Sequence, residues 1–295
     1  MDPDFTSLHH KRLEDLRVAI FGLGLMGGSL ALGLRGKCAG LWGVDPDPEA
    51  RRLAQETGVF TAVTDLAAQF PFETDLLILA APVGAILRLL DGLPALVANP
   101  AAVLDLGSTK RSIVEKMAEL PPRFDPLGGH PMCGKEVGGL ANADASIFRA
   151  AAFGFTPLER TSPWLRARAA ELAQALDARP LWLDPLTHDR WAAWTSHLPY
   201  LAAGALAGAV PAEAAPLAGS GLRSTVRLAA TPWSMMRDVL ETNRLNLLAS
   251  LQAYRASLQE LEALLEQNDF AELETRLAAG AARQQALVKL GAGSR

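Results

Sequence analysis

The 295-residue chain has little of several features that mark whole classes of protein. It contains only two cysteines, Cys38 and Cys133. A secreted fold held together by disulfides needs more, so we expect both to remain thiols in a cytoplasmic protein. The net charge is −4, and there is no long run of basic residues. Neither nucleic acid nor an anionic membrane surface is therefore an expected partner.

Long apolar runs are also missing. The N-terminal segment is polar and lacks the apolar core of a signal peptide. The uncharged stretch 193–210 contains Ser196, His197 and Pro199 among many small residues, so it is less apolar than a membrane span. We expect a buried helix there and no transmembrane segment.

The first half of the chain alternates short apolar runs with stretches of helical length. Hydrophobic residues make up 49% of the sequence and charged residues 20%, which is ordinary for a globular protein. Continuous apolar runs are typical of parallel strands buried on both faces, and strands that alternate with helices indicate βαβ units. The expected strands are 18–21, 41–44, 76–80, 103–106, 151–155 and 181–183, with early helices over 27–35 and 48–56.

The second half, from about Pro185, shows no strand pattern. The pattern over residues 188–210 predicts a helix interrupted near Pro199, and the pattern over 270–287 predicts a final helix. Apolar residues recur over 233–267 at helical steps. One helix of about 35 residues would be about 50 Å long, so we expect it to pack against a second subunit. A helix folded back on its own domain is the alternative.

Residues 22–27 carry the strongest local motif, G-x-G-x-x-G, directly after the first expected strand and at the start of a helix. Gly22 allows a tight turn, Gly24 removes a side chain that would hold off a pyrophosphate, and Gly27 allows close helix–strand packing. Free N–H groups at the helix start favour phosphate. Asp45 ends the second strand, 21 residues later than Gly24, and its carboxylate suits ribose hydroxyls and repels a 2′-phosphate. The motif favours NAD over NADP; a glycine-rich turn without a ligand is the alternative.

Together these patterns predict an α/β protein in two parts. We expect a Rossmann-type, doubly wound and mostly parallel sheet over residues 1–184. An all-α dimerisation domain is expected over 185–295, which makes a homodimer the expected assembly. The expected cofactor-binding residues here are Gly22, Leu23, Gly24, Leu25, Met26, Gly27, Asp45, Ala81 and Pro82.

Four further segments share a pattern with a known family. They are DLGSTK at 105–110, GHPMCGKE at 129–136, SHLP at 196–199, and RLA from Arg227 followed by MRD at 236–238. In their order and spacing, and with the N-terminal motif, they resemble the prephenate dehydrogenase family of tyrosine biosynthesis. The resemblance implies an NAD-dependent oxidative decarboxylation. Hydride leaves the ring carbon that bears the hydroxyl, the ring carboxylate departs as CO₂, and the ring becomes aromatic.

The resemblance assigns the chemistry to two residues. His130 matches the catalytic base that accepts the hydroxyl proton. Ser108 matches a residue that hydrogen-bonds the substrate hydroxyl and lies near the nicotinamide, which makes it an expected cofactor-binding residue as well. Histidine suits a base because its ordinary pKa lies near neutrality, and His130 follows an expected strand, where open α/β sheets bind ligands. A structural histidine is the alternative. Ser108 has a compatible second interpretation, as the N-cap of a helix from Lys110.

The anionic substrate needs cations and hydrogen-bond partners. By the resemblance Arg227 binds a carboxylate, which a guanidinium fork suits, and Arg223 is a supporting candidate one helical turn away. The resemblance also places His197 against the substrate, and we add Lys135 and Glu136. The alternatives are a solvated arginine and a buried helix histidine bonded to a carbonyl. No metal is expected.

Some positions depart from the family pattern. Lys135 stands where Thr or Ser is frequent, Cys133 replaces Ala, Tyr200 replaces His, and Met236 replaces Trp. These departures leave open whether the substrate is prephenate, with a keto acid side chain, or arogenate, with an amino acid side chain. Prephenate dehydrogenase is the expected function, and arogenate dehydrogenase is the alternative. We expect no ACT-type regulatory domain, so inhibition by tyrosine is expected to act at the active site.

Three other classes compete with this assignment. A β-hydroxy acid dehydrogenase needs a helical lysine after a glycine-rich segment, and residues 161–184 contain no such segment. A thiol enzyme pairing Cys133 with His130 needs a lowered thiol pKa, which nothing nearby in the sequence provides. A non-catalytic NAD sensor has no need of Ser108, His130 and Arg227 together. His188 either begins the helix that contains His197 or forms, with Asp189, an N-terminal capping feature.

Overall fold

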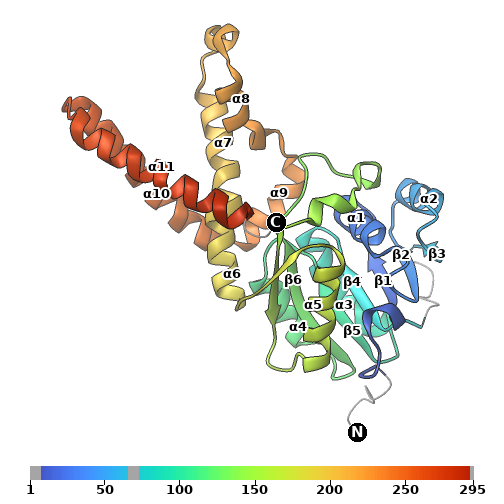
Figure 1. Cartoon of the computed structure of the whole chain (residues 1–295). Helices are drawn as coiled ribbons and strands as arrows, with labels where there is room; N and C mark the ends of the chain where they lie inside the picture. Colours follow the sequence, from blue (N-terminus) through green and yellow to red (C-terminus); the bar gives the residue numbers. More distant parts are fainter. Residues whose placement is uncertain (1–7, 66–72, 293–295) are drawn as a thin grey trace.

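A computed structural model describes residues 8–65 and 73–292 (Figure 1). Its centre is an eight-stranded sheet of order β3-β2-β1-β4-β5-β6-β7-β8, parallel except between β6 and β7. The strands are β1 Arg17–Phe21, β2 Gly40–Val44, β3 Ala62–Thr64, β4 Leu76–Leu79, β5 Ala101–Asp105, β6 Phe124–Pro131, β7 Ala152–Pro157 and β8 Arg179–Trp182. The predicted mostly parallel sheet is confirmed.

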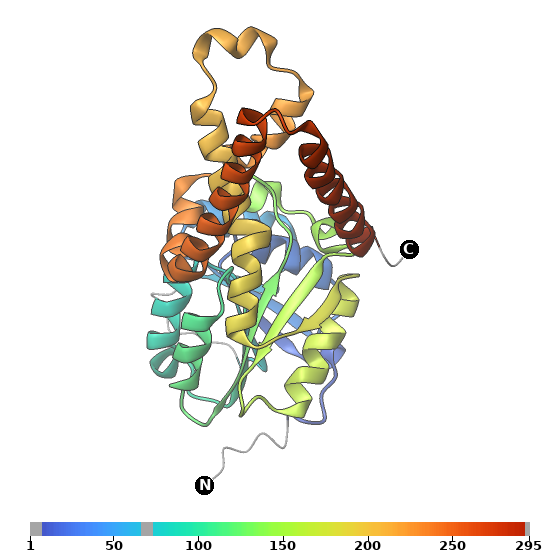
Figure 2. The ribbon, with the colours of Figure 1, turned by 90° about the vertical axis from the view of Figure 1, so that its left-hand side faces the viewer.

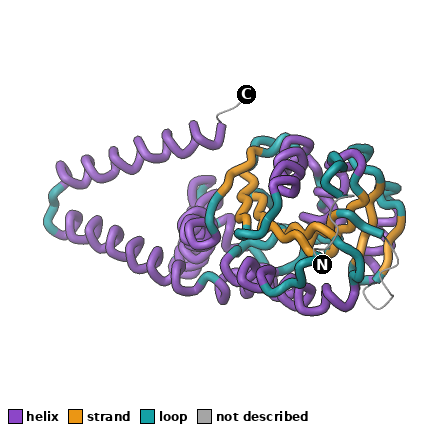
Figure 3. Tube along the Cα trace, turned by 90° about the horizontal axis from the view of Figure 1, so that it is seen from below, coloured by secondary structure: helices purple, strands orange, loops and turns teal. Residues whose placement is uncertain are grey.

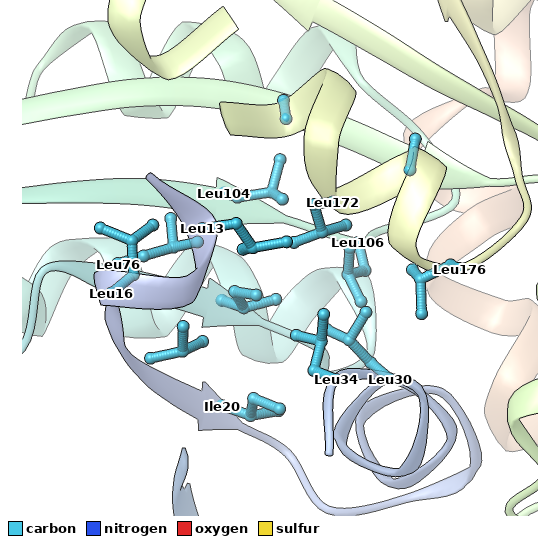
Figure 4. Close-up of a cluster of buried hydrophobic side chains, with 14 of the residues drawn as sticks. Leu13, Leu16, Ile20, Leu30, Leu34, Leu76, Leu104, Leu106, Leu172 and Leu176 are labelled. Atoms are coloured by element: carbon cyan, nitrogen blue, oxygen red, sulfur yellow. The ribbon is translucent and has the colours of Figure 1, made fainter. Parts of the chain in front are cut away.

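Helices pack on both faces of this sheet. Successive residues of a strand point to opposite faces; in β1, Val18 and Ile20 lie in one apolar cluster, and Ala19 and Phe21 in the other. Helices α1 and α5 contribute leucines to the first cluster (Figure 4), and α3 and α4 pack on the second. The helices are α1 Leu25–Leu34, α2 Pro48–Glu56, α3 Val83–Leu96, α4 Arg111–Ala118 and α5 Pro163–Ala175.

After β8 the described chain is helical. These helices are α6 Pro185–Ala192, α7 Leu198–Ala209, α8 Ser220–Thr225, α9 Trp233–Thr242, α10 Arg244–Glu266 and α11 Phe270–Ala292. Helices α10 and α11 diverge from their connecting turn and extend away from the sheet (Figures 2 and 3). The predicted all-helical second part is confirmed. Across residues 8–65 and 73–292, no helix is both long and apolar enough to cross a bilayer.

Two details of the expected elements are wrong. Strand β3, with three half-buried residues, was not expected. A strand end was expected before His130, but β6 extends over Phe124–Pro131 and includes His130 although it contains Pro126, Gly128 and Gly129. The single helix expected over 233–267 is broken at Asn243, between α9 and α10. The buried Asn243 side chain bonds to α6 and to His197, which requires the helix to turn there.

The helical part is attached to the sheet through two helix N-termini. Asp189 of α6 accepts hydrogen bonds from the backbone N–H groups of Lys110 (2.7 Å) and Arg111 (2.9 Å), at the start of α4. Asp238 of α9 accepts one from Gly84 (2.8 Å), at the start of α3. Carboxylates are stabilised at this end of a helix by unpaired N–H groups and by the helix dipole. These bonds fix the helical part against the carboxyl ends of the strands.

A buried ion pair reinforces the same edge. Lys110 is 0% exposed, and its ammonium pairs with Asp105 and donates to the Gly129 carbonyl at 2.6 Å. The other Asp105 oxygen accepts from the Gly129 N–H at 3.0 Å. The pair therefore ties the loop after β5 to β6, one residue before His130.

The substitution Lys110→Met tests this pair. It leaves the Asp105 carboxylate buried without its cation, and such a loss costs about 3–5 kcal/mol. Urea unfolding near neutral pH measures the change. Lys116→Met is the matched control, because Lys116 pairs with Asp91 and Glu119 at the surface and is expected to change stability by about 1 kcal/mol or less. Equal effects of the two substitutions would contradict the prediction.

Candidate active site

A cavity of about 610 Å³ opens at the carboxyl ends of β1, β2 and β4. Its lining includes five of the predicted cofactor residues, namely Gly22, Gly24, Asp45, Ala81 and Pro82. Leu23 lies in the turn between β1 and α1, and Leu25, Met26 and Gly27 form the first turn of α1.

The glycine turn has the geometry that a dinucleotide requires. Gly22 has a φ of +98°, which favours glycine, and a Cβ on Gly27 would lie 1.9 Å from the Gly22 carbonyl oxygen. A Cβ on Gly24 would meet nothing within 4 Å, so the space beside the turn is open. Gly24 precedes α1 and no side chain caps that helix, which leaves the helix start available to a phosphate. These residues fit NAD.

Asp45 is held in place beside this turn. Its carboxylate accepts hydrogen bonds from the backbone N–H groups of Leu23 at 2.6 Å and Asp47 at 2.8 Å. The two bonds fix the carboxylate at the end of β2, facing the glycine motif, where the sequence predicts ribose binding.

His130 lies at the end of β6 in a chain of buried side chains. Its Nδ1 is 3.0 Å from Nε2 of His188, and Nδ1 of His188 is 2.9 Å from a carboxylate oxygen of Asp189. Asp189 also accepts the two N–H groups of α4. Burial alone raises the pKa of the Asp189 carboxyl, but hydrogen bonds from His188, Arg111 and Lys110 hold it below its ordinary value.

These partners assign the ring protons. An ionised Asp189 only accepts, so Nδ1 of His188 carries a proton, and in the neutral form of that ring Nε2 is the acceptor. Nδ1 of His130 must then donate to that Nε2, which leaves Nε2 of His130 unprotonated. Burial lowers the pKa of His130 well below its ordinary value of 6.5, helped by repulsion from the Lys110 ammonium and from any proton added to His188 or His197. The geometry therefore presents a neutral imidazole that accepts a proton at Nε2.

His197 occupies a π-helical turn, Ala193–His197, between α6 and α7. Such turns are frequent at functional sites. The ring is buried, its Nδ1 lies 3.1 Å from the amide nitrogen of Asn243, and its Nε2 has no hydrogen-bond partner within the described part of the chain. The expected alternative, a bond to a backbone carbonyl, is not what the structure shows.

The loop after β6 meets the helical part through an ion pair. Glu136 pairs with Arg227, whose side chain is 58% exposed. Lys135 turns the other way, to the Asn142 carbonyl at 3.0 Å and to Asp144 at 3.5 Å. Of the two loop residues, Glu136 therefore meets Arg227, whereas Lys135 is directed toward 142–144.

Ser108 lies in the loop between β5 and α4. The prediction that it caps this helix is wrong, because α4 begins at Arg111 and Asp189 accepts the N–H groups at its start. The flanking residues hold the loop: the Gly107 N–H donates to Asp105 at 2.8 Å, and the Thr109 hydroxyl lies 2.8 Å from that of Thr242. Ser108 is thus free of a capping role.

Three of the four residues that depart from the family pattern lie against apolar cores. Tyr200 and Met236 belong to the cluster of α3 and α4, and Cys133 packs against the cluster of α1 and α5. Burial raises the pKa of the Cys133 thiol to about 12, which disfavours the thiol-enzyme alternative.

The sequence did not predict the part that four residues play in this network: Lys110, His188, Asp189 and Asn243. Asp189 does cap a helix, as expected of a capping feature, but it caps α4, whereas Asp184 caps α6. In the sequence these residues stand out only as polar side chains in mostly apolar segments. That pattern does not identify their hydrogen-bond partners.

Comparison with known proteins agrees with this geometry. The family model described as prephenate dehydrogenase, nucleotide-binding domain, matches residues 30–180, and the model for the prephenate dehydrogenase dimerization domain matches 184–279. The chain belongs to the prephenate dehydrogenase family. Its relatives include prephenate dehydrogenase of Bacillus subtilis, 28% identical over 85% of this chain and 71% of that protein. The prephenate dehydrogenase of Lactococcus lactis is 29% identical over 92% of this chain and 77% of that protein.

Two solved structures of the family are similar over nearly the whole chain. Prephenate dehydrogenase from A. aeolicus, in complex with hydroxyphenyl propionate and NAD⁺, has a TM-score of 0.86 and 26% identity, and covers 94% of this chain and 100% of its own. Synechocystis arogenate dehydrogenase has a TM-score of 0.77 and 29% identity, over 92% and 99%.

Buried neutral histidines make stability depend on pH. The pKa of His197 falls from 6.5 to about 4, because burial and the neighbouring His188 outweigh the attraction of Asp189. The unfolded chain therefore binds more protons below pH 6.5, so stability present above that pH is lost as the pH falls toward about 4. We expect urea unfolding to require less denaturant at about pH 5 than at about pH 7. His197→Gln should weaken that dependence, and an unchanged dependence in the variant would count against it.

Proposed function

We propose that this protein is an NAD-dependent prephenate dehydrogenase, which converts prephenate to 4-hydroxyphenylpyruvate and CO₂ in tyrosine biosynthesis. The observation that carries the proposal is the buried chain Asp189–His188–His130, which leaves Nε2 of His130 as an acceptor at the carboxyl end of β6. Family membership and the names of the relatives support the choice of substrate.

The residues divide the reaction among them. The turn of residues 22–27 holds the pyrophosphate and Asp45 the adenosine ribose, and bound NAD supplies the acceptor for the hydride. His130 takes the hydroxyl proton at Nε2 while the carbonyl character develops. The positive charge that forms on its ring is stabilised through His188 by the Asp189 carboxylate, and Ser108 orients the substrate hydroxyl.

Arg227 binds a carboxylate of the substrate. Its guanidinium is exposed and paired with Glu136, and a substrate carboxylate takes the place of the Glu136 carboxylate in that pairing. Exposed ion pairs contribute about 0–1 kcal/mol, so the exchange costs little. His197 supplies a second contact to the substrate, and Lys135 lies at the rim of the site.

NADH absorbance with purified protein tests the function directly. We expect absorbance to grow with NAD and prephenate, and to grow much less with NADP, because Asp45 repels a 2′-phosphate. Growth with arogenate alone would favour the alternative, arogenate dehydrogenase, which is the activity named for the Synechocystis relative. NAD binding without turnover of either substrate would favour a sensor.

His130→Asn tests the proposed base. Because general base catalysis contributes about 10²- to 10⁴-fold, we expect kcat to fall by that order while NAD affinity stays within about twofold. His9→Asn is the matched control, since His9 lies beside Trp164 and near Asp125, at the opposite end of β6 from His130. A His130→Asn variant with nearly full kcat would rule out the role.

We also propose a cytoplasmic homodimer. Helices α10 and α11 expose a series of large apolar side chains, including Leu248, Leu251, Tyr254, Leu258, Phe270 and Leu277. An apolar groove of about 830 Å³ lies between α7 and α10. Large exposed apolar side chains gathered on neighbouring helices are typical of a protein–protein interface. Light scattering after size-exclusion chromatography should give twice the 31.3 kDa chain mass, and a mass near one chain would refute the dimer.

A further inference from the structure

Asn243 lies at the break between α9 and α10 and is only 2% exposed. Its amide nitrogen is 2.7 Å from the backbone carbonyl oxygen of Asp189 and 3.1 Å from Nδ1 of His197. Its amide oxygen accepts a hydrogen bond from Asn246 at 2.8 Å. A single side chain thus connects α6, the π-helical turn and α10.

The carbonyl of Asp189 determines which way the Asn243 amide faces. A backbone carbonyl only accepts hydrogen bonds, so the amide atom 2.7 Å from it must be the nitrogen. An amide nitrogen carries two hydrogens. With one directed to Asp189, the other is directed to Nδ1 of His197, which therefore acts as an acceptor.

The tautomer of His197 follows from that bond. The ring is neutral near neutral pH, since burial lowers its pKa to about 4. A neutral imidazole carries one proton, and with Nδ1 accepting, that proton is on Nε2. Nε2 is buried, and the described residues offer it no acceptor. A buried donor without a partner is costly, which indicates that a ligand supplies the acceptor.

We propose that Asn243 is a positioning residue that holds His197 as an Nε2–H donor for an acceptor oxygen of the bound substrate. The substrate's identity rests on the proposed function. His130 is held in the opposite tautomer, with its proton on Nδ1 and Nε2 free to accept. The site therefore contains one histidine that takes a proton and one that only donates a hydrogen bond, and neighbouring side chains set the difference.

The ¹⁵N spectrum of the imidazole rings tests the tautomer without any substrate. The chain has five histidines, and the His197 signals are identified by their loss in His197→Gln. We expect a protonated Nε2 and an unprotonated Nδ1 at His197 near neutral pH. The same spectrum contains His130 as an internal reference with the reverse pattern. A proton on Nδ1 of His197 in the wild-type protein would overturn the proposal, whether or not any variant folds.

Asn243→Asp then tests the cause. The carboxylate has nearly the same shape but only accepts, so Nδ1 of His197 should acquire a proton. The groups facing this ring, His130, His188 and Asp189, are unchanged. An unaltered His197 spectrum in this variant would show that Asn243 does not set the tautomer.

A double-mutant cycle separates positioning from a merely structural role. We expect Asn243→Ala and His197→Ala each to raise KM for prephenate by roughly tenfold, with little change in KM for NAD. If Asn243 acts through His197, Asn243→Ala should add almost nothing in the His197→Ala background. Additive effects would overturn the proposal. Absence of turnover in the wild-type protein would instead refute the proposed function, and the spectrum would still decide the tautomer.

Discussion

The hydrogen bonds of the Asp189 carboxylate are the constraint on which the rest of the site depends. One carboxylate from α6 accepts two N–H groups at the start of α4 and the ring N–H of His188. It thereby docks the helical part against the sheet and, through His188, orients His130, the proposed base, in one set of contacts. A buried carboxylate is stable only when its oxygens are paired, so the geometry of the base and the docking of the two parts cannot vary independently.

Much of the sheet and the nucleotide turn could be predicted because their signals are local. The glycines of 22–27 and Asp45 have fixed spacing that backbone sterics dictate, and the apolar runs of β1, β2, β4 and β5 reflect burial on both faces. The extent of β6 escaped this reasoning because Pro126, Gly128 and Gly129 lower its strand propensity. There, tertiary pairing with β5 and β7 overrides local preference.

The hydrogen-bond network could not be predicted, because its members are far apart in sequence. His130 and His188 are 58 residues apart, and Asn243 and His197 are 46 apart. Helical periodicity over 233–267 continues through Asn243, so the pattern predicted one helix where the chain turns. Only the tertiary structure shows that this asparagine satisfies the Asp189 carbonyl and His197 at once. The resemblance supplied His130 and His197 as residues, and the structure supplies the hydrogen-bond partners from which their tautomers are inferred.

Burial separates the parts of the site that stay fixed from those that can exchange partners. Lys110, Asp105, Asp189 and Asn243 are buried and fully engaged, so moving any of them leaves an unpaired polar group at a cost of about 1–3 kcal/mol or more. Glu136 and Arg227 are 35% and 58% exposed, where water replaces a lost partner. The proposed proton transfer needs fixed distances between the buried side chains. The proposed binding of a substrate carboxylate needs an ion pair that can open, as that of Glu136 and Arg227 can. Lys135 belongs to the exposed loop and bonds to the Asn142 carbonyl and to Asp144, so its departure from the family pattern leaves the buried network around His130 unchanged.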